Sequence, residues 1–305
     1  MFEPMYGSIV LEMVSDAPAG EILGETTKEY TFEACGEKLD MAELQEIWES
    51  KLEPVYPYRK AGPAVEKING SLTAPTAPKI GVAKPKVIIP VFPGTNCEYD
   101  TAKAFARAGA DPEILVIRNL TPADVTASCE ALVKAIGESQ IVMLPGGFSG
   151  GDEPDGSAKF IASFFRSPAV TEAVRRLLQQ RDGLMLGICN GFQALIKLGL
   201  VPYGDIRPIT AYDPTLTFNT IGRHQSMLVR TRVASTGSPW LSHCDAGSEY
   251  EIAISHGEGR FVAPQNVLDQ LVANGQVATQ YVDLEGEPTM DQRYNPNGSL
   301  LAIEG

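Results

Sequence analysis

From residue 86 onward, short apolar runs alternate with longer stretches of helical periodicity. The runs at 87–92, 113–117, 141–144 and 184–188 are typical of strands buried on both faces of a sheet. Each run leads through a turn into a predicted helix, and Thr121-Pro122 supplies an N-cap and a first-turn proline for one of them. This order predicts an α/β fold: a doubly wound, mostly parallel sheet with helices on both faces.

The pattern changes after about residue 215, where polar and apolar positions alternate along the strand-like segments. These segments cover 227–233, 250–255 and 276–282. Alternation of this kind is typical of strands with one solvated face. We therefore expect antiparallel additions, within one domain spanning 86–305.

Residues 1–85 lack a pattern that could bury a core. Residues 1–52 contain strand-like runs at 8–11 and 30–32 and one helix that begins at Asp40, with Glu43 placed as in a capping box. Residues 53–85 carry six prolines and no apolar period, which indicates an extended linker, wrapped over a surface or partly mobile. We expect a small α+β fragment at 1–52, the end of a larger domain, and no independent domain within 1–85.

Composition excludes several classes of protein. Among 305 residues no apolar run approaches the length of a membrane span, and the first residues lack the features of a secretory signal. The net charge of −13 disfavours binding to nucleic acid or to an anionic membrane. The five cysteines are odd in number and form no C-x-x-C pair, so we expect reduced thiols, a cytoplasmic protein and no metal site.

The sharpest chemical feature is the sequence Gly187-Ile188-Cys189-Asn190-Gly191, which joins an apolar strand to a predicted helix. Flanking glycines permit the strained strand-to-helix turn of a nucleophile elbow, and a helix N-terminus favours the thiolate. A small buried thiol that only fills space is the alternative. We interpret Cys189 as a nucleophile.

A glycine-rich loop, Pro145–Asp152, follows another apolar strand. Its backbone N–H groups are suited to an oxyanion hole, or alternatively to a phosphate. The loop lacks the ending of a P-loop, which makes nucleotide binding the weaker interpretation. Both this loop and Cys189 follow strand carboxyl ends, so we expect them to open on the same crevice.

His256 and Glu258 provide the third feature, in the sequence Ser255–Arg260. Residues two apart on a strand face the same side, so a Cys189–His256–Glu258 triad is one hypothesis. In the other, His256 only shapes a loop that borders the pocket. His224 and His243 have no carboxylate at a useful spacing and are interpreted as ordinary surface or loop residues.

Four motifs in this order resemble those of phosphoribosylformylglycinamidine synthase, over its glutaminase domain, a class I glutamine amidotransferase. They are Phe92–Glu98, Pro145–Asp152, Gly187–Gln193 and Ser255–Arg260. Residues 1–52 look like the tail of the synthetase part of the same enzyme. The resemblance implies hydrolysis of glutamine through a thioester. It implies transfer of ammonia to the synthetase domains, which use ATP and Mg²⁺ in a ligase reaction of purine biosynthesis, and it implies no cofactor in this chain.

The resemblance also implies roles for individual residues. Cys189 is the nucleophile, the backbone N–H groups of Gly147 and Asn190 form the oxyanion hole, and the glutamine pocket is lined by Gln193, Ser255 and Gly257. In the family the catalytic His-x-Glu motif lies downstream of a sequence that matches 295–298. This sequence ends at Gly305, so we expect that motif to lie outside it. The triad with His256 and Glu258 remains an alternative, as does a noncatalytic docking domain that retains the glutamine pocket.

Overall fold

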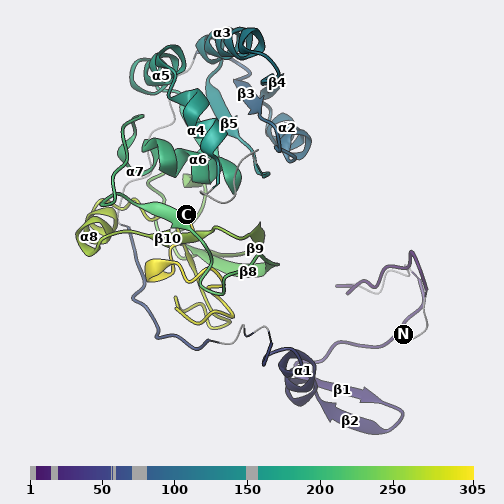
Figure 1. Ribbon diagram of the computed structural model, residues 1–305. Helices are drawn as coiled ribbons and strands as arrows, with labels where there is room; N and C mark the ends of the chain where they lie inside the picture. The colour runs from purple at the N-terminus through teal and green to yellow at the C-terminus, as the bar shows by residue number, and fades with distance from the viewer. Residues whose placement is uncertain (1–4, 15–19, 56, 58–59, 71–80, 149–156) are drawn as a thin grey trace. The chain divides into compact units, whose positions relative to one another are not determined.

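The computed structural model describes residues 5–14, 20–55, 57, 60–70, 81–148 and 157–305. The chain divides into two compact units, Met1–Pro57 and Tyr58–Gly305. The first is called the small unit below and the second the large unit (Figure 1). The boundaries predicted at 52 and 85 stay predictions.

The small unit contains a hairpin and one helix. Strands β1 (Thr31–Ala34) and β2 (Glu37–Asp40) pair antiparallel, and α1 (Met41–Ser50) follows directly. The Asp40 side chain accepts hydrogen bonds from the N–H groups of Ala42 and Glu43, which confirms the predicted helix start. The strand predicted at 8–11 is wrong, because no described segment pairs with that run and its residues are exposed.

A four-stranded parallel sheet forms the centre of the first half of the large unit. Its order is β4-β3-β5-β6. The strands are β3 (Lys86–Val91), β4 (Asp111–Val116), β5 (Ile141–Leu144) and β6 (Leu184–Gly187). The chain passes from β3 to β4 on one side of it, and then to β5 and β6 on its other side. The order in which strands are added to the sheet therefore changes direction between β3 and β5.

Helices cover both faces of this sheet, as predicted (Figure 1). On one face the side chains of Val87, Ile89 and Met143 pack against α2. On the other face Ile88, Val142 and Leu144 belong to the largest core of the molecule, which α3 to α6 complete. The helices are α2 (Glu98–Arg107), α3 (Pro122–Glu138), α4 (Lys159–Phe165), α5 (Pro168–Arg175) with a π-helical turn at Arg176–Gln180, and α6 (Asn190–Leu198).

The second half of the large unit is built on antiparallel strands. One sheet has the order β11-β8-β9, and a two-stranded sheet pairs β10 with β7. The elements are α7 (Leu200–Tyr203), β7 (Thr215–Thr217), β8 (Gln225–Val233), β9 (Glu249–His256), β10 (Arg260–Val262), α8 (Gln265–Ala273), β11 (Thr279–Tyr281) and two 3₁₀ turns, Pro239–Leu241 and Leu300–Ala302. The antiparallel additions expected after residue 215 are therefore confirmed.

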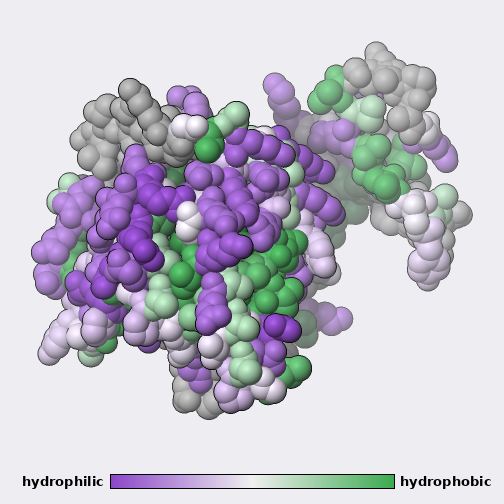
Figure 2. Space-filling view, turned by 90° about the horizontal axis from the view of Figure 1, so that it is seen from above, coloured by the Kyte–Doolittle hydropathy of each residue, from purple (hydrophilic) through white to green (hydrophobic). Residues whose placement is uncertain are grey.

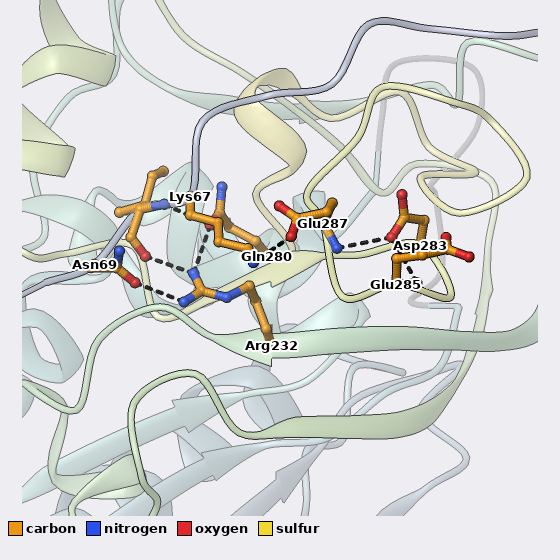
Figure 3. A network of polar contacts seen from close by, with 8 residues as sticks. Lys67, Asn69, Arg232, Gln280, Asp283, Glu285 and Glu287 are labelled. Atoms are coloured by element: carbon orange, nitrogen blue, oxygen red, sulfur yellow. Dashed lines mark hydrogen bonds and ion pairs between the residues drawn. The ribbon is translucent and has the colours of Figure 1, made fainter.

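Residues 60–70, called the strap below, lie in extended conformation along the second half of the large unit (Figure 3). Backbone hydrogen bonds join the strap to residues 288–292, and Ile68 belongs to the core of this half. The buried guanidinium of Arg232 donates to the Ile68 carbonyl at 2.8 Å and to the Asn69 side chain at 2.7 Å. Gln280 donates to the strap and accepts from the Ile68 N–H at 2.9 Å.

Hydrophilic side chains predominate on the surface in the view of Figure 2, with smaller groups of hydrophobic ones between them. Among the described residues no helix is both long and apolar enough to cross a membrane.

Candidate active site around Cys189

Cys189 stands on the turn between β6 and α6, as the sequence predicts. Its backbone has φ 52° and ψ −111°, a strained conformation for a residue with a side chain. The flanking glycines are required by close packing: a Cβ at Gly187 would approach the Gly191 carbonyl to 2.6 Å, and one at Gly191 would overlap the Leu144 carbonyl. The prediction of an elbow with unusual backbone geometry is confirmed.

The turn places the Cys189 sulfur at the N-terminus of α6. The thiol lies 3.8 Å from the Ser255 carbonyl oxygen, to which it donates, and the side chain is half-buried. The aligned peptide dipoles of α6 favour a negative charge at this end of the helix. The location therefore favours the thiolate form, which is the nucleophilic form of cysteine.

The Gly147 backbone lies beside Cys189 and is fixed by its neighbours. Phe148 N–H donates to the Gly94 carbonyl at 2.9 Å, and Asn96 N–H donates to the Gly146 carbonyl at 3.3 Å. Gly147 itself has φ 148°, and in the described part of the chain its N–H has no hydrogen-bond partner. An N–H directed by a fixed loop and left unused is what stabilisation of a developing negative charge requires. Residues 149–152 of the same motif lie outside the described residues.

A cavity of about 350 Å³ opens next to Cys189, a volume that suits a small molecule. Its walls come from the β5 and β6 ends, from the loop before β8 and from the end of β9. The lining residues are Gly147, Phe148, Ser157, Cys189, Gln193, Phe218, Gly222, Arg223, His224, His256, Gly257 and Glu258. The predicted residues Asn190 and Ser255 lie just behind this wall: Asn190 begins α6, and Ser255 contacts Cys189 through its carbonyl oxygen.

Gln193 and Asn190 are both buried and bonded to each other. The Asn190 amide donates to the Gln193 side-chain oxygen at 3.0 Å, and the Gln193 amide donates to the Glu258 carbonyl at 2.8 Å. Both polar atoms of the Gln193 side chain are therefore hydrogen-bonded within the protein, and the amide holds the backbone at Glu258 on the other side of the cavity. This is a positioning contact, which the sequence pattern did not reveal.

The Cys189–His256–Glu258 triad is not assembled in this structure. The buried Glu258 carboxylate accepts hydrogen bonds from the N–H and hydroxyl of Ser157, whereas His256 Nδ1 has no hydrogen-bond partner within the described ranges. Burial lowers the pKa of the His256 imidazole, with a smaller contribution from His224, which favours the neutral form of the ring. The expectation relied on a strand running through Glu258, but β9 ends at His256, and the two-residue period ends with it.

His224 is a pocket residue that the sequence interpretation missed. Its Nε2 lies 2.9 Å from the Ser255 hydroxyl, and its ring centroid is 6.0 Å from that of Phe148. The pairing of β8 with β9 explains this position, because Gln225 stands opposite His256 and the preceding residue therefore lies at the same end of the sheet. A hairpin predicted between these two strands from the sequence would have placed His224 near His256.

No group of three or more His, Cys, Asp or Glu side chains in the described ranges is arranged to hold a metal ion.

Comparison with known proteins yields a consistent set of relatives. Residues 84–305 match the family described as CobB/CobQ-like glutamine amidotransferase domain. The phosphoribosylformylglycinamidine synthase subunit PurQ of Salinibacter ruber is 35% identical over 215 residues, which cover 70% of this chain and 78% of the relative. The same subunit of Symbiobacterium thermophilum is 36% identical over 218 residues, with the same coverage of 70% and 78%.

A solved structure, that of PurLQS from Thermotoga maritima, is similar with a TM-score of 0.50 at 24% identity. The match covers 72% of this chain and 80% of that one. At this identity the likeness supports the α/β fold.

Proposed function

The chain belongs to the CobB/CobQ-like glutamine amidotransferase family, and on this premise we propose that it provides the glutaminase activity of a phosphoribosylformylglycinamidine synthase. Glutamine is hydrolysed, and its ammonia passes to the synthetase part of the same enzyme, in which ATP and Mg²⁺ drive amidine formation. This chain uses no cofactor of its own in the glutaminase steps. The observation that carries the proposal is Cys189 at positive φ on a strand-to-helix turn facing a small pocket.

In the first step the Cys189 thiolate attacks the side-chain carboxamide carbon of glutamine. A carbon–sulfur bond forms, and the carbonyl electrons move onto the oxygen. Two backbone N–H groups are suited to receive this oxyanion: that of Gly147, which is unused in the described structure, and that of Asn190, the first residue of α6. Donors fixed before the reaction stabilise the developing charge without reorganisation.

Glutamine is held in the cavity beside Cys189. Gly257 lines this cavity, and the Ser255 carbonyl contacts the Cys189 thiol behind the cavity wall. Gln193 supports the wall by its hydrogen bond to the Glu258 carbonyl. His224 holds the Ser255 hydroxyl. We therefore assign His224 as a positioning residue for this side of the pocket.

Two steps require proton transfer. Collapse of the first intermediate needs a proton on the departing ammonia, and hydrolysis of the glutamyl thioester needs an activated water. Among the described histidines, His224 and His256 line the pocket, but His224 is bonded to Ser255, and His256 is not hydrogen-bonded to Glu258. The family resemblance assigns the acid–base role to a His-x-Glu motif, and we propose that such a motif, rather than His256, serves these two steps.

The first experiment is labelling with a glutamine analogue that carries an electrophilic ketone. We expect modification of Cys189 and none in Cys189→Ser. Cys129→Ser is the matched control, because Cys129 lies on α3 beside Ser167 and away from the pocket, and this variant should be labelled like the original protein. Labelling of Cys189 that glutamine does not slow would contradict the substrate assignment.

The second experiment measures ammonia release with and without an added downstream His-x-Glu segment. General acid–base catalysis contributes roughly 10²–10⁴-fold, so residues 1–305 alone should label readily and turn over very slowly. The added segment should restore turnover. Rapid turnover by residues 1–305 that His256→Ala abolishes would instead make His256 the base. Labelling without turnover, even with the segment, would favour the noncatalytic docking domain.

A further inference from the structure

Cys97 and Cys189 lie on either side of Gly146. A Cβ atom placed on Gly146 would stand 3.4 Å from the Cys97 sulfur and 3.5 Å from the Cβ atom of Cys189. Because both atoms are close to one point, the Cys97 sulfur lies less than about 7 Å from the Cys189 Cβ atom. A disulfide places the two Cβ atoms about 3.5–4.5 Å apart, so the two cysteines must move toward each other for the bond to form. The missing side chain of Gly146 leaves the space between the two cysteines open.

The fold fixes both cysteines in this relation. Cys97 precedes α2, just beyond the carboxyl end of β3, and Cys189 follows β6. The strand between them in the sheet is β5, which leads into Gly146. The hydrogen bond from Asn96 N–H to the Gly146 carbonyl ties the Cys97 loop to this glycine.

The two thiols differ in chemistry. Both cysteines stand at a helix N-terminus, which favours the thiolate, but α2 has acidic residues in its first turn next to Cys97, whereas α6 has none next to Cys189. Partial burial, followed by the negative charges of Asp100 and Glu98, raises the pKa of the Cys97 thiol. Peroxides react with thiolates, so Cys189 is the cysteine expected to react first, with Cys97 as a neighbouring second thiol.

We propose that Cys97 and Cys189 are a reversible disulfide site, closed when a peroxide oxidises Cys189. The Cys189 thiolate attacks one peroxide oxygen, the O–O bond breaks, and after uptake of a proton the products are a sulfenic acid and water. The Cys97 sulfur then attacks the Cys189 sulfur. The S–O bond breaks, and the hydroxyl leaves as water with the Cys97 proton. In total, two thiols lose two electrons to one hydrogen peroxide and yield a disulfide and two waters.

This bond requires the Cys189 side chain to rotate away from the Ser255 carbonyl toward Cys97. Once formed, the disulfide withholds the nucleophile and prevents its irreversible oxidation to the sulfinic acid. A reducing thiol restores both cysteines, with Cys189 as the better leaving group because the Cys97 thiol has the raised pKa. The inference goes beyond the proposed function and is tested without measuring glutamine hydrolysis.

The experiment treats the protein with hydrogen peroxide, blocks free thiols by alkylation and identifies linked peptides by mass spectrometry without reduction. We expect a linked Cys97–Cys189 peptide that disappears after reduction, is absent from Cys97→Ser and persists in the control Cys129→Ser. At excess peroxide, Cys97→Ser should accumulate about tenfold more Cys189 sulfinic acid, because its sulfenic acid has no second thiol.

Gly146→Ala provides a second variant that keeps both thiols. Its methyl group would fit at van der Waals distance from each cysteine and stand between them, so the yield of the linked peptide should fall. This variant tests the geometry even where Cys97→Ser disturbs the start of α2. The proposal is overturned if the linked peptide is absent from the original protein, if Cys189 links to Cys35, Cys129 or Cys244 instead, or if Gly146→Ala links equally well.

Discussion

Helices α1 and α6 are almost equal in length but opposite in burial. In α6 seven of nine residues are buried, whereas in α1 none of ten is buried, and Ile47 and Trp48 are 62% and 79% exposed. Both helices have an apolar side in the sequence, and in both the helix was predicted. The contrast shows that periodicity predicts a helix but does not predict what the helix is buried against.

The same contrast extends to the two units. None of the described residues of the small unit is buried, while the large unit contains several buried clusters of apolar side chains. Burial of apolar area is the main favourable term in folding, so the large unit carries the stability of this chain. Each unit contains one of the two tryptophans, Trp48 and Trp240, which allows their unfolding to be followed separately.

The largest expected effect comes from a core truncation in α6. In a Trp48→Phe background, Leu198→Ala should lower the free energy of unfolding of the large unit by about 2–5 kcal/mol, because Leu198 is completely buried. Ile47→Ala in exposed α1 is the control and should change it by less than about 0.5 kcal/mol. Urea unfolding followed by Trp240 fluorescence provides the measurement. Equal effects of the two variants would show that the small unit shares the core.

A second effect concerns the strap. Arg232→Ala should destabilise the large unit by about 1–3 kcal/mol, because the buried Ile68 carbonyl and Gln280 side chain lose a donor. The control is Arg230→Ala on the same strand, where the ion pairs with Glu249 and Glu251 are partly exposed and worth about 0–1 kcal/mol. The same fluorescence measurement applies. A loss no larger than that of the control would mean that the strap contributes little.

A third effect is present at neutral pH and is lost in acid. Hydrogen bonds from Tyr203 and Thr210, with Arg207 nearby, lower the pKa of Asp213 to about 2. A lowered pKa in the folded state stabilises it above the ordinary carboxyl pKa, and this stabilisation is lost as the pH falls toward about 2. Asp213→Asn should therefore be less stable than the original protein at pH 7, and the difference should narrow below about pH 4. Urea unfolding at several pH values measures it, and a constant difference would refute the linkage.

The smallest expected effect is local to α1. Asp40→Ala removes the N-cap of an exposed helix, at a cost of about 1 kcal/mol, and amide exchange in α1 should become roughly fivefold faster. Thr121→Ala removes the corresponding cap of α3, four of whose residues are buried, and exchange in the middle of α3 should stay slow. Hydrogen exchange with mass spectrometry compares them. Equal acceleration in both helices would contradict the burial contrast.

The parts of the site within one turn of the chain were predictable from the sequence. The Gly187–Gly191 motif could be identified because close packing at the elbow requires a glycine at both positions. The Asp40 and Thr121 caps are local in the same sense. Such features depend on a few consecutive residues and little else.

Features that depend on pairing between distant segments were not predictable. His224 reaches the pocket because β8 pairs with β9, and Glu258 binds Ser157, which is remote in sequence. The run at 8–11 has the composition of a strand but no partner among the described residues. In each case the interaction that decides the structure joins residues far apart in the sequence. A hydrophobic pattern covers only neighbouring residues and does not reveal it.

The strap has a consequence for where this protein can be divided. Residues 84–305 match the glutamine amidotransferase family, yet the large unit begins at Tyr58. A version trimmed to the matched residues would keep every residue of the pocket. It would also leave the Arg232 guanidinium without two of its acceptors and remove Ile68 from the core. The family match begins at residue 84, whereas the compact unit begins at Tyr58. A shortened version of the protein made for expression should therefore start at the beginning of the compact unit.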